Sequence, residues 1–168
     1  MKYFLIQHEI ENGDKYVSSE FDMNLELVLQ GKQSPRTYYQ GENNTDYISG
    51  CFGVSEKAKD FFKSLNNPNI EFTSTKVYNI DTDEPLDVYL TKVNIELDCI
   101  DYEKSELFVL SDKKIRGVDK MVLKTDINED IFTIKNLLRI FINENLKDKI
   151  IAHHLKGFRF VPIEKFTF

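Results

Sequence analysis

The fold class is decided by residues 54–72, which read VSEKAKDFFKSLNNPNIEF. Ser55 makes a good helix N-cap, because its hydroxyl can accept a free amide of the first turn. The apolar side chains that follow recur at helical spacing and share one face of about 100°: Ala58, Phe61, Phe62 and Leu65. Asn66-Asn67-Pro68 ends the helix, and the β-branched run 70–78 predicts a strand after it.

A second stretch, 142–160, aligns with 54–72 without a gap. Asn143 takes the place of the Ser55 cap, a helix is predicted to about Lys156, and Gly157 is placed for the left-handed C-terminal position. Four identities in nineteen positions leave chance and duplication both open. Two strand–helix–strand units among further strands predict an α+β fold. We expect a single domain over residues 1–168, with a mostly antiparallel sheet and two principal helices packed on one face.

The rest of the chain supplies strands and one long connection. Residues 2–7 and 25–29 are expected to be extended, and the apolar run 131–142 has a turn signal near Asn136. Residues 31–46 are rich in Gly, Gln, Ser, Pro, Asn and Thr. This composition predicts a long loop.

Composition and charge exclude several classes of protein. The 168 residues carry 22 basic and 28 acidic side chains, a net charge of −6, which argues against a nucleic-acid-binding surface. The acidic excess lies wholly within residues 1–84. No apolar run approaches the ~20 residues of a membrane span. The apolar start at 3–6 is too short for a secretory signal, so we expect a cytoplasmic protein, with its two cysteines buried and reduced.

The densest polar feature is the run from Glu96 to Glu106, with five carboxylates in eleven residues. Such a run is most often a solvated turn, and it is also the best partner-facing candidate in the chain. Oxygen-rich clusters can bind divalent cations, but the spacing here lacks the Asp-x-Asp-x-Asp-Gly pattern of a calcium loop. Acid–base catalysis would require one of these carboxylates to be desolvated.

Nucleophile and phosphate-binding motifs are absent from the sequence. Of the three histidines, His153 and His154 are adjacent and point about 100° apart on a helix, so they are poorly placed to bind one metal ion. His154 falls within the apolar arc of its predicted helix. We therefore expect it to be half-buried and structural.

Three groups of residues resemble a bacterial family. They are Gly53-Val54-Ser55-Glu56, the stretch 93–105 with Leu97-Asp98-Cys99-Ile100-Asp101-Tyr102, and Gly157-Phe158-Arg159-Phe160. Together they resemble immunity protein family 11 of bacterial polymorphic-toxin systems, over residues 47–163. The resemblance implies a small cytoplasmic protein, encoded beside a toxin, that neutralises the toxin by direct binding. It implies no enzyme activity and no cofactor, and from the spacing of the carboxylates and histidines we expect no metal site.

An acidic inhibitor suits a basic toxin, because opposite charges accelerate association. We therefore expect the partner-binding residues to be Asp98, Asp101, Glu103 and Glu106. Two other functions stay open at this point. One is a small hydrolase that uses these carboxylates, with or without a metal, together with a histidine. The other is a structural or regulatory module that forms homo-oligomers through its aromatic side chains.

Overall fold

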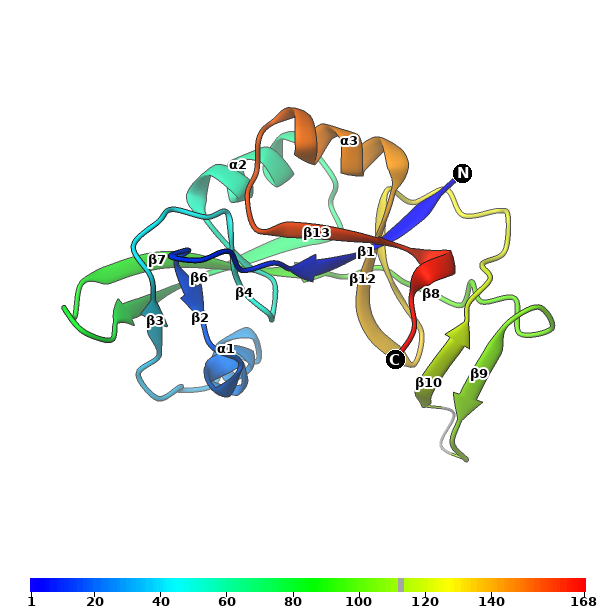
Figure 1. The fold of residues 1–168 in the computed structure, drawn as a ribbon, viewed down its shortest axis with the longest axis horizontal. Helices are drawn as coiled ribbons and strands as arrows, with labels where there is room; N and C mark the ends of the chain where they lie inside the picture. Colours follow the sequence, from blue (N-terminus) through cyan, green and yellow to red (C-terminus); the bar gives the residue numbers. More distant parts are fainter. Residues whose placement is uncertain (112–113) are drawn as a thin grey trace. The chain divides into compact units, whose positions relative to one another are not determined.

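The computed structural model describes residues 1–111 and 114–168, apart from the side chain of Leu138 (Figure 1). The α-helices are α1 (Asp22–Leu29), α2 (Glu56–Ser64) and α3 (Glu144–Ala152), with short 3₁₀ turns η1 (Ser19–Phe21) and η2 (Ile163–Lys165). The strands of the N-terminal half are β1 (Tyr3–His8), β2 (Tyr16–Val17), β3 (Tyr38–Gln40), β4 (Tyr47–Ser49), β5 (Gly53–Val54), β6 (Ile70–Asn79) and β7 (Pro85–Val93). Those of the C-terminal half are β8 (Glu96–Leu97), β9 (Glu106–Val109), β10 (Ile115–Lys120), β11 (Ile131–Ile134), β12 (Leu137–Asn143) and β13 (Phe158–Pro162).

This mixture of helices and strands confirms the predicted α+β class. The described chain forms two compact units. Unit 1 comprises residues 1–7, 93–152 and 160–168, and unit 2 comprises residues 8–92 and 153–159. The single domain expected over 1–168 stays a prediction.

Unit 1 contains most of a five-stranded sheet of order β13-β1-β12-β11-β8, all but residue 8 of β1 and residues 158–159 of β13, and a two-stranded sheet of β10 and β9. The antiparallel pair β11–β12 turns at Asn136, whose φ of 65° is left-handed, as the turn signal predicted. Helix α3 follows β12 directly. Its cap is Asn143, whose side-chain oxygen accepts from the Leu146 N–H at 2.9 Å. The core of this unit is apolar, with Leu5, Phe132 and Phe141 at its centre.

Unit 2 contains a six-stranded sheet of order β2-β3-β6-β7-β5-β4. Helices α1 and α2 lie on its two opposite faces (Figure 1). Leu25 of α1 packs with Val88 and Leu90 of β7, whereas the Lys59 ammonium of α2 lies 4.1 Å from the centroid of the intervening Tyr89 ring. Alternate residues of a strand point to opposite faces, so the two helices cover different sides.

Three details of the predicted secondary structure are wrong. Residues 25–29 are part of helix α1, because Leu25, Val28 and Leu29 share a helical face against the core. The long loop expected at 31–46 contains strand β3, which pairs parallel with β6 through Tyr38 and Tyr78. Helix α3 ends at Ala152, four residues earlier than predicted.

Candidate protein-binding surface

The acidic turn comprises residues 98–105, which connect β8 to β9 in unit 1, together with Glu106, the first residue of β9. Its backbone is anchored at both ends. Near the start, Cys99 is buried and the Asp101 N–H donates to the Val122 carbonyl at 2.9 Å. Near the other end, the Ser105 hydroxyl accepts from the Val122 N–H at 2.9 Å and donates to the Val122 carbonyl at 3.2 Å. The turn therefore presents its carboxylates from a fixed backbone.

The four carboxylates predicted to bind a partner lie together in this turn but differ in their surroundings. Asp98, Glu103 and Glu106 are exposed, and within residues 1–111 and 114–168 none of the three forms an ion pair. Asp101 has only 19% of its side chain exposed and accepts a hydrogen bond from the Lys104 ammonium at 2.6 Å. This hydrogen bond lowers the pKa of Asp101 below its usual value. The carboxylates of the turn that form no ion pair among the described residues are therefore those of Asp98, Glu103 and Glu106. Two lysines lie close to them, because the Lys124 ammonium donates to the Asp98 carbonyl at 2.9 Å and Lys120 is the register partner of Glu106 on β10.

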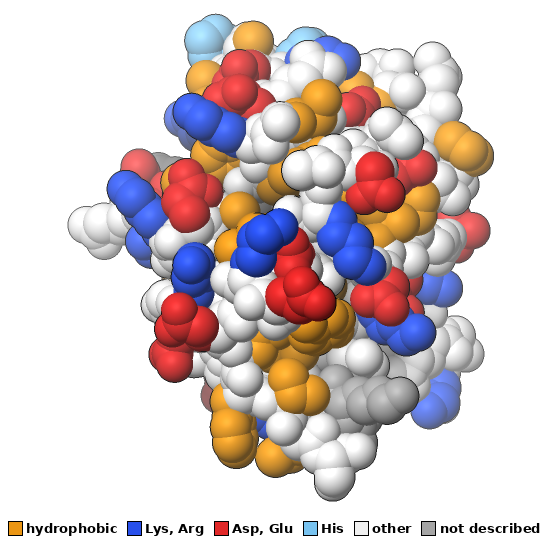
Figure 2. Space-filling model, turned by 90° about the vertical axis from the view of Figure 1, so that its right-hand side faces the viewer, with side chains coloured by type: hydrophobic (Ala, Val, Ile, Leu, Met, Phe, Trp, Pro, Cys, Tyr) orange, Lys and Arg blue, Asp and Glu red, His pale blue; other side chains and the backbone are white. Residues whose placement is uncertain are grey.

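An exposed apolar strand follows the acidic turn without a break. Phe108, Val109 and Leu110 are 64%, 41% and 39% exposed. Figure 2 shows hydrophobic side chains exposed on this side of the molecule, bordered by charged ones. Exposed apolar side chains next to charged ones are typical of protein-binding surfaces, which have an apolar centre and a polar rim. This apolar surface was not predicted from the sequence. Its only signal in the sequence is the short apolar run 107–110.

The structure gives little support to a metal or catalytic site in the turn. Among the described residues, no group of three His, Cys, Asp or Glu side chains is arranged to hold a metal ion. His154 is exposed and follows the end of α3 with a φ of 51°, so the half-buried position predicted for it is wrong. Burial raises the pKa of the Cys99 thiol to about 11, which keeps it protonated.

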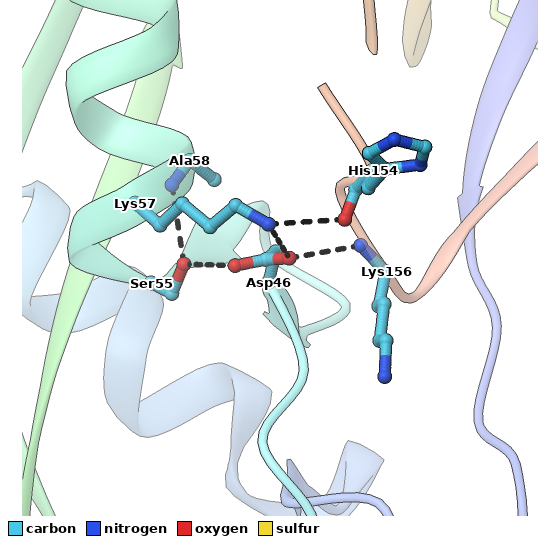
Figure 3. A network of polar contacts seen from close by, with 6 residues as sticks. All are labelled: Asp46, Ser55, Lys57, Ala58, His154 and Lys156. Atoms are coloured by element: carbon cyan, nitrogen blue, oxygen red, sulfur yellow. Dashed lines mark hydrogen bonds and ion pairs between the residues drawn. The ribbon is translucent and has the colours of Figure 1, made fainter. Parts of the chain in front are cut away.

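A polar network centred on the buried Asp46 joins separate segments of unit 2 (Figure 3). The Asp46 carboxylate accepts from the Ser55 hydroxyl at 2.7 Å and from the Lys156 N–H at 2.9 Å. Its second oxygen also lies 3.7 Å from the Lys57 ammonium, which donates to the His154 carbonyl at 3.0 Å. Asp46 thus joins the start of α2 to residues far away in the sequence. With only 10% of its side chain exposed, it acts as a structural tie and is not a contact residue.

Sequence reasoning identified only one part of this network. Ser55 was predicted as the cap of α2, and its hydroxyl does accept from the Ala58 N–H at 3.1 Å. Asp46 lies at the end of the predicted loop 31–46, and its bond to Lys156 could not be predicted, because 110 residues separate the two and no local pattern joins them.

The family of the chain follows from a comparison with models of known protein families. The model of the Immunity protein family (Imm11) matches residues 4–165 of the 168. The chain belongs to this immunity protein family. The match includes residues 4–46, which the resemblance seen in the sequence did not cover, and it spans both units. Among curated proteins, none matches the chain.

Membership in the immunity protein family gives the acidic turn and its neighbouring strand a context. Proteins of such a family act on a protein partner, so an exposed charged and apolar surface is the first place to look for contacts. No helix among the described residues is long and apolar enough to cross a membrane.

Proposed function

We propose that this chain binds a cognate bacterial toxin and neutralises it without catalysis, in the cytoplasm of the cell that makes it. The observation that carries the proposal is the family match over residues 4–165. Direct binding requires a surface that another protein can cover. The acidic turn and the exposed strand after it supply one, with the charge at one end and the apolar side chains at the other.

The charge of the turn points to a basic toxin. Asp98, Glu103 and Glu106 are exposed and form no ion pair with any residue that the structure describes, so a cationic partner can approach them without displacing one of the described ion pairs. Asp101 contributes less free charge, and we assign it mainly to the conformation of the turn through its bond to Lys104. Long-range attraction of this kind raises the association rate more than it lowers the dissociation rate.

The test begins with the toxin domain encoded by the gene next to that of this chain. Co-expression of the two should rescue growth, and purified chain should bind the purified domain. Continued toxicity together with no measurable binding would refute the proposal. Inhibition that depends on turnover of a substrate by the chain would refute its non-catalytic part.

Charge variants test the assigned surface. The triple variant Asp98→Asn, Glu103→Gln, Glu106→Gln should slow association with the toxin domain about tenfold at low salt and flatten the salt dependence of the rate. A matched control removes the same charge from exposed carboxylates of unit 2: Glu71→Gln, Asp81→Asn and Glu84→Gln. Equal effects of the two triple variants would show that net charge matters and that the turn does not.

A further inference from the structure

Strand β9 lies at the edge of its sheet. It pairs with β10 on one side, and no other described strand pairs with it. The far side of β10 is not free in the same way, because Val118 exchanges two hydrogen bonds with Phe168. The Val118 N–H donates to the Phe168 carbonyl at 3.0 Å, and the Phe168 N–H donates to the Val118 carbonyl at 3.3 Å. One outer side of this small sheet is therefore covered, and the other is open (Figure 1).

The register shows which backbone groups face the open side. In an antiparallel pair, the N–H and C=O of one residue point the same way, and the direction alternates along the strand. Val118 points toward Phe168, so its partner Leu107 forms a non-hydrogen-bonded pair with it and points away from β10. Leu110 donates to the Lys114 carbonyl at 3.0 Å and so points inward. Alternation then places the polar groups of Val109 outward, like those of Leu107.

Apart from its short length of four residues, β9 lacks the usual protection of a strand edge. Soluble proteins block open edges with bulges, prolines or charged side chains. The two irregularities of this hairpin leave the extra residues, Arg116 and Asp119, in β10, whereas residues 106–109 of β9 pair without a break. Strand β9 contains no proline, and its one charged residue, Glu106, lies at its first position. The side chain of Phe108, which projects from a face of the sheet and not from its edge, is 64% exposed.

We propose that an extended segment of the toxin adds to β9 as a further strand, hydrogen-bonded to the outward backbone groups of Leu107 and Val109. This inference rests on the proposed function and specifies how the partner is recognised. Strand addition gives affinity through main-chain bonds and specificity through alternate side chains. The incoming strand packs an apolar side chain beside Phe108.

The acidic side chains beside the open edge of β9 determine the chemistry of the segment that would bind there. The acidic turn leads directly into β9, so Glu103 and Glu106 lie at the start of the open edge. The incoming segment therefore carries Lys or Arg at the end that meets Glu106 and apolar residues beyond it. A second copy of this chain fits less well, because each copy carries a net charge of −6.

Amide exchange followed by NMR tests the geometry and the occupancy in turn. In the free chain, the Leu107 and Val109 amides should exchange faster than that of Phe108. In the complex with the toxin domain encoded beside this gene, the Leu107 and Val109 amides should become protected. Binding of the toxin domain without protection of these two amides would overturn the inference and leave the proposed function standing. Absence of binding would remove both.

A proline substitution tests the edge by a second route. Val109→Pro removes an N–H that makes no bond to β10, so the sheet should persist while binding of the toxin domain weakens at least about tenfold. Val109→Ala keeps the N–H and should bind within about threefold of wild type. If circular dichroism shows that Val109→Pro is unfolded, Val109→Lys blocks the edge by charge. Equal binding by the blocking variant and Val109→Ala would overturn the inference, as would a dimer of the free chain that the blocking variant abolishes.

Discussion

The Ser55→Ala substitution should destabilise the protein by about 3 kcal/mol. The Ser55 hydroxyl makes two bonds, and alanine removes both. Loss of the bond from the Ala58 N–H removes the cap of α2, which contributes about 1 kcal/mol. Loss of the 2.7 Å bond to Asp46 withdraws a donor from a buried carboxylate, and hydrogen bonds to charged groups contribute about 2 kcal/mol. The free energy of unfolding in urea, followed by circular dichroism, measures the sum.

A double-mutant cycle separates the two contributions. Asp46→Ala also removes the acceptor for the Lys156 N–H, so it should cost at least as much as Ser55→Ala. The double variant should lose less than the sum of the single variants, with a coupling of about 1–2 kcal/mol, because the bond between the two residues can be lost only once. Strict additivity, or a cost of Ser55→Ala no greater than that of an ordinary helix cap, would show that the Asp46 bond contributes nothing to stability.

Three further predictions concern single groups. Burial lowers the pKa of His8, whose ring stacks on that of Tyr47 with the two centroids 4.9 Å apart. Because the unfolded chain then binds more protons than the folded one, the free energy of unfolding should fall as the pH drops through 6.5. His8→Gln should reduce this pH dependence, measured by urea titration at several pH values. Gly157→Ala should cost about 2 kcal/mol or more in unfolding free energy, because its φ is +85° and the new Cβ would lie 2.9 Å from the Tyr47 carbonyl oxygen. The control Gly31→Ala also has a positive φ, but its Cβ would meet no atom within 4 Å, so it should cost only about 1 kcal/mol. The Cys99 thiol, with a pKa of about 11, should react with a disulfide reagent at pH 8 only after urea is added, and labelling of the native protein at the rate of a free thiol would contradict its burial.

The sequence predicted the features that depend on local chemistry. The caps at Ser55 and Asn143 are both confirmed by side-chain bonds to the third amide beyond them, because capping involves only four consecutive residues. The turn at Asn136 is confirmed for the same reason: its left-handed backbone is a property of the residue and its two neighbours.

Helix α1 was missed because its apolar residues satisfy two periods at once. Leu25, Leu27 and Leu29 alternate as a strand requires, whereas Leu25, Val28 and Leu29 fit one face of a helix. Packing against the sheet decides between them, since the helical set contacts Val88 and Leu90 and Leu27 is left outside that cluster. A short pattern of this kind cannot be assigned without its neighbours.

The candidate surface likewise has features that the sequence predicts and features that only the structure shows. Its acidic residues could be predicted, because charge is visible in the sequence and the turn leaves three of the four side chains exposed. Which of them carries free charge could not, since only the structure shows Asp101 paired with Lys104. The open edge of β9 could not be predicted from the sequence. It depends on the pairing of Val118 with Phe168, 50 residues away, and on bulges that fall in β10.

Charge and the open edge explain different parts of recognition, and neither is sufficient alone. Carboxylates such as Glu103 act over a Debye length of about 10 Å, so they attract many basic proteins and fix no orientation. A strand edge acts only at hydrogen-bond distance, and most extended segments can pair with it. Placed end to end, as Glu106 and Val109 are within one strand, the two features select a segment that is basic at one end and apolar at the other. Removing the charge should therefore change mainly the rate of association, whereas blocking the edge should change mainly the rate of dissociation.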